Sequence, residues 1–288
     1  MKECLFYTHQ ENGTARCELC PHRCLIKPGS AGLCRSRVNR DGTLVTLAYS
    51  HPCSLAIDPI EKKPLYFFHP GEECLSLACA GCNLRCKGCQ NHEISQVGPD
   101  DTEHYELTPD ELIALARKYR QDIIAYTYTE PLTWYEYTLD CCRLAHENGM
   151  KNVLVSAGYI NEEPLRQIAP FIDAANIDLK YFNDDTYRRM SNASLAPVLR
   201  TLQILREHRV WLEITHLMVP GTETEDEFRS MCIWLKDNGF SDSPLHLSRF
   251  FPRYLLTNGY RPTPLDTLRC AKQIAEEEGI RHIFLGNV

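Results

Sequence analysis

The chain has 288 residues, enough to bury a full hydrophobic core in one large domain or in a large domain with a small attachment. Hydrophobic residues make up 43% of it and charged residues 24%, which excludes an intrinsically disordered chain. The formal net charge of −7 gives no indication of binding to a nucleic-acid backbone. No apolar run is long enough to cross a bilayer and residues 1–4 have no signal-peptide layout, so we expect a cytoplasmic protein without a membrane partner.

The N-terminal quarter of the chain differs in composition from the rest. Residues 1–70 are rich in cysteine, glycine, proline and short polar turns, and their one apolar run, at 44–49, predicts a short hairpin strand. We therefore expect a small cysteine-rich, metal-binding region at 1–70 and a main domain at 71–288.

From about residue 75, apolar runs of strand length alternate with amphipathic helical stretches, which is the pattern of βα units. The expected strands are 75–78, 123–127, 153–156, 174–179, 210–217, 244–250 and 282–285, and the expected helices are 108–120, 132–148, 161–172, 194–208, 223–238 and 264–278. Gly149, Gly239 and Gly279 stand where left-handed helix ends are expected. The pattern predicts an α/β fold in which a parallel sheet curves into a partial, TIM-like (βα)6 barrel. Ligands bind such folds at the carboxyl ends of the strands.

Fifteen cysteines are too many for routine core packing in a reducing compartment, where a disulfide framework is not expected. Eleven of them fall within the first 89 residues. The other four, Cys141, Cys142, Cys232 and Cys270, lie in helix-like stretches, where we expect them to be small buried apolar residues.

One group of closely spaced cysteines comprises Cys17, Cys20, Cys24 and Cys34. Thiolates this close together on a turning backbone converge on soft metals, and four of them complete a site. A structural zinc and an auxiliary iron–sulfur cluster suit this spacing equally well. Four reduced surface thiols are the least favoured interpretation, because exposed thiols oxidise.

A second group, Cys82-x3-Cys86-x2-Cys89, directly follows the expected strand at 75–78 and so lies on the ligand-binding rim. Three thiolates leave one metal position open, and on a four-iron cluster they leave one iron free for a small-molecule ligand. A structural zinc knuckle or buried thiols would also explain three cysteines. The strand before them and the barrel after them argue against both alternatives.

These residues carry a close family resemblance that extends along almost the whole chain. Gly81 and the three cysteines, followed by six βα units, resemble the radical S-adenosylmethionine (radical SAM) superfamily. Within it the chain is similar to the glycyl-radical-activating branch, and more narrowly to the radical SAM enzyme of the AmmeMemoRadiSam system, related to pyruvate formate-lyase activating enzyme. The matching stretches are 17–24, 58–66, 81–91, 126–131, 176–180 and 246–250.

The resemblance implies a 4Fe–4S cluster on Cys82, Cys86 and Cys89, with S-adenosylmethionine on its unique iron and no catalytic residue beyond the cluster ligands. One electron, from a low-potential donor such as flavodoxin or ferredoxin, would cleave S-adenosylmethionine to methionine and a 5′-deoxyadenosyl radical that abstracts hydrogen. The substrate would be a glycine in a partner protein, or alternatively a small molecule or another peptide. A different class of function remains open, that of a metal-binding adaptor whose thiol sites are structural and support no turnover.

The resemblance also places candidate residues around S-adenosylmethionine. Relatives carry a Gly-Gly-Glu-Pro segment that meets the methionine amino group, and Tyr128 and Thr129 stand here in place of the two glycines. The expected cofactor-binding residues are Asn91, Thr129, Glu130, Ser156, Asp178 and Lys180. Simpler interpretations are a helix-start acid for Glu130, a turn residue for Asp178 and a solvated lysine for Lys180.

Two further expectations concern charged and histidine residues. Relatives carry a histidine near position 251, where this chain has phenylalanine, so His216 and His246 are the nearest candidates for that contact. The charge run 58–63 is expected to be a solvated face.

Overall fold

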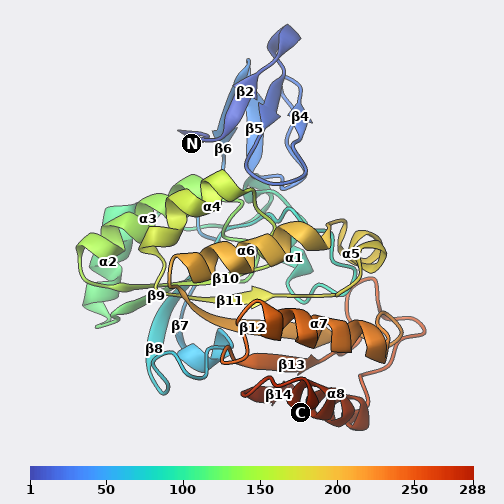
Figure 1. Ribbon diagram of the computed structural model, residues 1–288. Helices are drawn as coiled ribbons and strands as arrows, with labels where there is room; N and C mark the ends of the chain where they lie inside the picture. The colour runs from blue at the N-terminus through green and yellow to red at the C-terminus, as the bar shows by residue number, and fades with distance from the viewer.

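The computed structural model describes all 288 residues and is built around one curved eight-stranded sheet (Figure 1). The strands, in spatial order, are β14 (Ile283–Gly286), β13 (Leu245–Arg249), β12 (Trp211–Met218), β11 (Ala174–Asp178), β10 (Lys151–Ser156), β9 (Ile123–Tyr126), β8 (Glu73–Ala78) and β7 (Ser54–Pro59). Strands β8 to β14 run parallel, whereas β7 pairs antiparallel with β8. The predicted partial parallel barrel is therefore confirmed, and β7 extends it by one edge strand.

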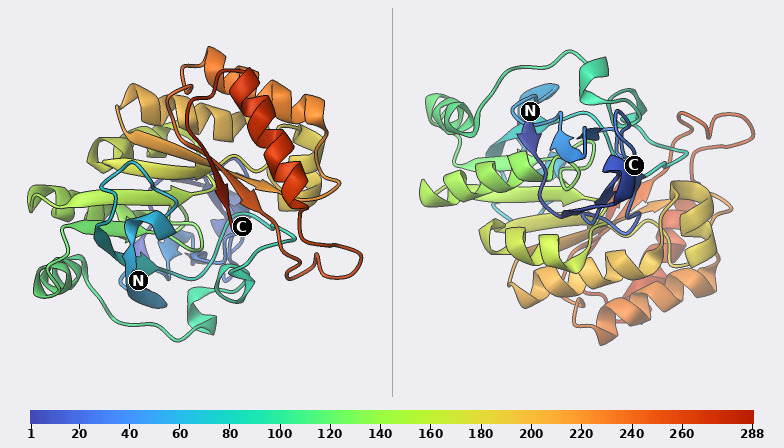
Figure 2. Two further views of the ribbon diagram at one scale, coloured as in Figure 1. Left: turned by 90° about the horizontal axis from the view of Figure 1, so that it is seen from below. Right: turned by 90° about the horizontal axis from the view of Figure 1, so that it is seen from above.

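The helices lie along the outer side of the curved sheet (Figure 2). Those predicted from periodicity are α2 (Pro109–Lys118), α3 (Tyr135–Glu147), α4 (Glu162–Ile168), α6 (Leu195–Glu207), α7 (Glu225–Asp237) and α8 (Leu265–Glu277). Gly149, Gly239 and Gly279 take φ values of 74°, 80° and 91°, so the predicted left-handed helix ends are confirmed. Two helices were not expected, the short α1 (His92–Ser95) and α5 (Asp184–Ser191). No helix combines the length and the apolar character that a bilayer span requires.

The N-terminal segment forms two small three-stranded sheets at one end of the barrel (Figure 1). One contains β1 (Lys2–Glu3), β5 (Arg37–Arg40) and β6 (Thr43–Thr46), and the other β2 (Tyr7–His9), β3 (Ala15–Cys17) and β4 (Leu25–Ile26). The hairpin expected near residue 44 is the β5–β6 pair. Division of the chain near residue 70 stays a prediction.

The charge run 58–63 corrects an expectation from the sequence. Asp58 and Lys63 are 4% and 1% exposed, and the Lys63 ammonium lies 2.7 Å from an Asp58 carboxylate oxygen. Of Asp58, Lys62 and Lys63, only Lys62 has a largely exposed side chain. Its ammonium lies 2.6 Å from the other Asp58 carboxylate oxygen. The prediction of a solvated face was wrong for Asp58 and Lys63, because β7 brings Asp58 into the large sheet and the buried charges compensate one another.

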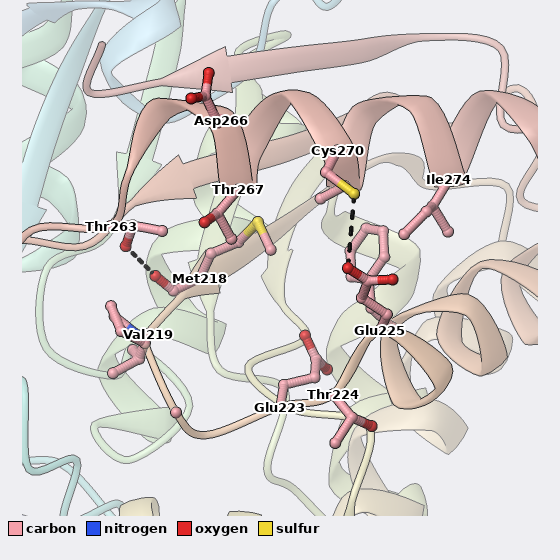
Figure 3. Close-up of a pocket in the computed structure, with 14 residues that line it drawn as sticks. Met218, Val219, Glu223, Thr224, Glu225, Thr263, Asp266, Thr267, Cys270 and Ile274 are labelled. Carbon is pink, nitrogen blue, oxygen red and sulfur yellow. Dashed lines mark hydrogen bonds between the residues drawn. The ribbon is translucent and has the colours of Figure 1, made fainter.

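The helical cysteines follow the prediction with one exception. Cys141, Cys142 and Cys232 are fully buried in the core. Cys270, on α8, is exposed, so the expectation of burial was wrong for this residue. It lies beside a pocket between α7 and α8 (Figure 3) rather than against the sheet.

Candidate functional site

The three-cysteine loop follows β8 at the carboxyl end of the sheet, where the sequence predicted it. Each thiol has a polar neighbour: Leu84 N–H donates to Cys82 Sγ (3.3 Å), the Cys86 thiol donates to Ser191 Oγ (3.3 Å), and Cys89 Sγ lies 3.2 Å from Ser95 Oγ. Burial raises the pKa of the Cys82 and Cys86 thiols. A bound metal cluster takes thiolates as ligands and supplies the positive charge that this buried position otherwise lacks.

Helix α5 supports this loop from one side. The loop N–H groups of Arg85 and Lys87 donate to the carbonyls of Ser191 (2.8 Å) and Met190 (2.9 Å), which lie at the end of α5. One of the two helices that the sequence analysis missed, α5, therefore holds the cysteine loop. A signal was available in Asn183, whose side chain accepts from Thr186 N–H as an N-cap.

Glu130 and Ser156 come together at the ends of β9 and β10. The Glu130 carboxylate is fully buried and accepts from Ser156 Oγ (2.7 Å), Ala157 N–H (2.8 Å) and Leu132 N–H (3.1 Å). Burial raises its pKa, and these three hydrogen bonds oppose the rise. Glu130 is thus an organised buried acid that joins two strand ends, not merely a helix-start residue.

Asp178 and Lys180 form an ion pair at the end of β11, with Lys180 Nζ 2.7 Å from Asp178 Oδ2. Burial lowers the pKa of Lys180, but the Asp178 carboxylate and the nearby Cys86 sulfur outweigh it and raise the pKa. Lys180 is therefore an ammonium paired with Asp178 and close enough to Cys86 for the two to interact electrostatically, which differs from the solvated lysine of the simpler interpretation.

Tyr128 takes a backbone conformation that usually belongs to glycine, with φ at +74°. Its hydroxyl donates to Asp58 Oδ2 (2.8 Å), and Lys63 Nζ lies 4.7 Å from the centre of its ring. Its carbonyl accepts from Asn91 Nδ2 (3.2 Å), directly after the cysteine loop. The Tyr128 side chain thus contacts the charge run that begins at the end of β7, while its backbone carbonyl meets the residue that follows the cysteine loop.

Thr129, next to it, donates through Oγ1 to the Cys79 carbonyl (2.5 Å) and so also lies against the cysteine loop. Asp58 and Lys63 were missed as residues of this region. The only indication in the sequence was that both residues come shortly before β8. Nothing in residues 58–63 themselves shows that Tyr128 packs on them.

The two candidate histidines are each held by a carboxylate. His246 Nε2 lies 2.7 Å from Glu213, which also accepts from two backbone N–H groups, and these contacts outweigh burial and lower the pKa of Glu213. His216 lies 2.8 Å from Glu223 and 2.8 Å from the Leu179 carbonyl. Neither ring hydrogen-bonds a residue of the cysteine loop.

The other cysteine group lies close to the first. Cys17, Cys20, Cys24 and Cys34 line one small cavity together with His22 and Asn83, which follows Cys82 in the loop. His22 Nε2 is 2.9 Å from the Asn83 carbonyl, and Ser36 Oγ donates to the Ala80 carbonyl (3.1 Å). The N-terminal sheets therefore pack directly on the three-cysteine loop.

No set of three or more His, Cys, Asp or Glu side chains is arranged around a point that would hold a single metal ion. A 4Fe–4S cluster makes a different demand, because its cysteine ligands bind different irons and need not converge on one point. Three cysteines on one loop, flanked by the Lys180 ammonium and two serine hydroxyls, fit such a cluster. What metal, if any, the four N-terminal cysteines bind stays a prediction.

Comparison with known sequences gives three informative matches. The profile of the radical SAM superfamily matches residues 77–235, more than half of the chain. A protein of Methanocaldococcus jannaschii described as uncharacterized is 43% identical over 289 residues, which covers 100% of this chain and 86% of that protein. A pyruvate formate-lyase-activating enzyme of Clostridium pasteurianum is 23% identical over 164 residues, which covers 54% of this chain and 67% of the enzyme.

Solved structures give the same picture of the fold. SuiB of Streptococcus suis superposes with a TM-score of 0.57 at 10% identity over 73% of this chain, though over only 48% of SuiB. QueE of Escherichia coli superposes with a TM-score of 0.50 at 11% identity, over 82% of this chain and 93% of QueE. At these identities the likeness concerns the arrangement of the sheet and helices.

Proposed function

The chain belongs to the radical SAM superfamily, whose members bind a 4Fe–4S cluster and S-adenosylmethionine, and we propose that Cys82, Cys86 and Cys89 hold that cluster. The observation that carries the proposal is the three-cysteine loop at the carboxyl end of β8, flanked by the Asp178–Lys180 ion pair. A 4Fe–4S cluster held by these three cysteines would supply the single electron that reductive cleavage of S-adenosylmethionine requires.

Lys180 is proposed to bind the methionine carboxylate. It is an ammonium held 2.7 Å from Asp178, and its electrostatic interaction with Cys86, one of the proposed cluster ligands, supports this role. A charge-assisted hydrogen bond from Nζ would fix the carboxylate and leave Asp178 to hold the ammonium in place.

Glu130 is proposed to accept from the methionine amino group. Its Oε1 already accepts from Ser156 Oγ and Leu132 N–H, whereas Oε2 accepts only from Ala157 N–H. A carboxylate oxygen accepts two hydrogen bonds, so Oε2 has one site left. Ser156 is then a positioning residue, and Asn91 and Thr129 hold the backbone that lines the same region.

Apolar residues of the loop after β13 close the cysteine loop from the other side. A Cβ built on Gly88 would lie 3.1 Å from Leu256 Cδ1 and 3.2 Å from Phe250 Cε2, so these side chains pack tightly on the loop. Both are buried. Such a cover would keep water and oxygen away from a reactive carbon radical.

The substrate is proposed to be a glycine in a partner protein, reached with electrons from a flavodoxin or ferredoxin. The similarity to pyruvate formate-lyase-activating enzymes over about half of the chain supports this choice. A small molecule or a peptide is the alternative, because the residues around the cysteine loop specify the radical and not its target.

The proposed ligand set is tested by iron analysis after anaerobic reconstitution with iron and sulfide. A triple Cys82→Ala, Cys86→Ala, Cys89→Ala variant is expected to lose about four irons per chain and the spectral change that S-adenosylmethionine produces in the reduced protein. Cys232→Ala, at a buried core cysteine, is the matched control and should retain both. Full iron content and an unchanged spectrum in the triple variant would contradict the assignment.

A further inference from the structure

Four cysteines of the N-terminal sheets (Figure 1) line one small cavity. Cys17 ends β3, Cys24 directly precedes β4, and Cys34 lies just before β5. Cys17 and Cys34 are buried, whereas Cys20 and Cys24 are partly buried. The interpretation as four exposed thiols therefore does not describe this group, and the chain brings four sulfurs to one place inside the protein.

The spacing of these cysteines favours an iron–sulfur cluster over a zinc ion. Cys17, Cys20 and Cys24 form one short run, and Cys34 follows at a distance. Three cysteines in a run with a remote fourth are typical of iron–sulfur ligand sets, whereas structural zinc sites usually take their ligands in two pairs. Cys17 N–H donates to the Cys24 carbonyl (3.0 Å), so the backbone brings the two ends of the run together.

The arrangement of the side chains points the same way. No three of these thiols converge on one point, as the ligands of a zinc ion must, about 2.3 Å from the metal. The ligands of an iron–sulfur cluster bind different irons and stand farther apart. The cavity has a volume of only about 10 Å³. Bonded sulfurs lie much closer to a metal than the roughly 3.5–4.0 Å of non-bonded contacts, so a cluster needs less free volume than an unbonded guest of the same size.

Hydrogen-bond donors around the sulfurs suit thiolates. The buried Arg37 guanidinium donates to Cys17 Sγ (3.5 Å). Burial raises the pKa of Cys34, and the backbone N–H groups of Ser36 and Arg37 oppose the rise. Donors of this kind stabilise a charged sulfur more than a neutral thiol. Bound iron would supply the positive charge that several thiolates in one buried place require.

A residue of the barrel completes the lining. Asn83, which follows Cys82 in the three-cysteine loop, lines the cavity and donates its Nδ2 to the Tyr159 carbonyl (2.8 Å). The Asn83 carbonyl lies 2.9 Å from Nε2 of His22, which belongs to the Cys17–Cys24 run. The four N-terminal cysteines therefore lie beside the three-cysteine loop but share no thiol with it.

We propose that Cys17, Cys20, Cys24 and Cys34 hold a second iron–sulfur cluster, in which every iron has a protein ligand. On assembly each thiol releases its proton and forms one bond to iron, and inorganic sulfide completes the cluster. Because no iron is left open, this cluster has no position for S-adenosylmethionine. It therefore differs in role from the cluster proposed for the three-cysteine loop, and it does not rest on that assignment.

The test uses the triple Cys82→Ala, Cys86→Ala, Cys89→Ala variant, so that the iron it binds belongs to the N-terminal cysteines. The variant is purified and reconstituted with iron and sulfide under anaerobic conditions, and its iron, acid-labile sulfide and zinc are counted per chain. We expect about two to four irons, an equal number of sulfides and no stoichiometric zinc.

A second readout is spectroscopic. S-adenosylmethionine should leave the electron paramagnetic resonance spectrum of the reduced triple variant unchanged, because no iron of the N-terminal cluster is open to it. A spectral change on addition of S-adenosylmethionine would show an open iron and would contradict a cluster whose irons all have protein ligands.

Two further variants in the triple background separate the ligands from the fold. Cys24→Ala, at a partly buried thiol, is expected to lose at least about half of the remaining iron. Cys4→Ala is the matched control and should keep all of it, because Cys4 is a buried cysteine of the same region that lies outside the cavity lining. Circular dichroism establishes that each variant is folded. A folded triple variant without iron, one zinc per chain without labile sulfide, or equal iron in Cys24→Ala and Cys4→Ala would each overturn the proposal.

Discussion

A buried ion pair joins the N-terminal sheets to the barrel. Arg37 on β5 and Glu136 on α3 are 1% and 0% exposed, and the Arg37 guanidinium also donates to the Leu5 carbonyl (2.9 Å). Glu136 in turn accepts from Leu5 N–H (2.8 Å). The pair therefore closes a small network in which each charge depends on the other.

Removing one charge of this pair should be strongly destabilising. Glu136→Gln leaves the Arg37 guanidinium buried without its counter-charge, and we expect a loss of about 3–5 kcal/mol in the free energy of unfolding. Denaturant unfolding under anaerobic conditions measures it. Glu147→Gln, at an exposed position of the same helix, is the control and should change stability by about 0.5 kcal/mol or less. Equal losses of unfolding free energy in the two variants would show that the Arg37–Glu136 ion pair does not stabilise the fold in this way.

Tyr128 gives a prediction about cofactor affinity. In Tyr128→Phe the ring stays but the hydrogen bond to Asp58 is lost, so the left-handed backbone beside Asn91 is held less firmly. We expect S-adenosylmethionine to bind about three- to tenfold more weakly, the effect of one hydrogen bond of about 1 kcal/mol. Equilibrium dialysis measures this directly. Tyr105→Phe, at an exposed tyrosine, should bind as the unaltered chain does, and identical affinities for both variants would refute the anchoring role.

His216 predicts a pH dependence of stability. Burial lowers its pKa, but the Glu223 carboxylate at 2.8 Å outweighs burial and raises the pKa above the usual value of 6.5. A group with a raised folded pKa stabilises fully below its unfolded pKa, and that stabilisation is lost as pH rises through the folded pKa. The free energy of unfolding should therefore fall more steeply above pH 6.5 in the unaltered chain than in His216→Gln. Parallel pH profiles for the two proteins would contradict this.

At the scale of elements, the junction between β8 and the cysteine loop depends on one glycine. Gly81 has φ +98°, and a Cβ built there would lie 2.3 Å from Ser36 Oγ and 2.5 Å from the Cys34 carbonyl. No side chain fits between the N-terminal sheets and the loop at this point.

The chain supplies a matched pair of variants for this junction. Gly71 also has a positive φ, +83°, but nothing lies within 4 Å of its Cβ position. Gly71→Ala should cost about 1–2 kcal/mol of stability from backbone strain alone. Gly81→Ala should cost more and should also lower the iron retained on reconstitution, because the loop must move away from Ser36. If both variants behave alike, the close packing is not required.

Periodicity predicted the seven parallel strands and their six major helices, because long amphipathic and apolar stretches carry a clear pattern. It did not predict α5, whose eight residues include two acids and two arginines. Nor did it predict β7, since that strand has only one short apolar run, Leu55 to Ile57, before Asp58 and Pro59. In both cases tertiary contacts, and not local composition, decide the structure.

The residues of the candidate site likewise fall into those that the sequence predicted and those that it did not. The three cysteines were predictable from spacing after a strand, and Glu130, Ser156, Asp178 and Lys180 do lie at strand ends as expected. The contact of Tyr128 with Asp58 spans 70 residues of sequence, so no local pattern indicates it. Residues whose chemistry is unusual can therefore be recognised in one sequence, whereas the ordinary residues that orient them cannot.

At the scale of the whole molecule, two cysteine-bearing regions meet at one end of the barrel. The β5 segment contacts the cysteine loop through Ser36, and the turn at His22 contacts it through Asn83. The pocket between α7 and α8 lies away from this junction, on the outer layer of helices (Figure 1). The molecule thus presents one candidate centre for radical chemistry, with the N-terminal cysteine group beside it.

The most direct test of the central proposal is formation of 5′-deoxyadenosine. The reconstituted chain would be incubated anaerobically with dithionite and S-adenosylmethionine, and the products analysed by mass spectrometry. We predict 5′-deoxyadenosine and methionine from the unaltered chain and from Cys232→Ala, and neither product from Cys86→Ala or without dithionite. Intact S-adenosylmethionine recovered from chain that contains a full cluster, or equal cleavage by Cys86→Ala, would contradict the account.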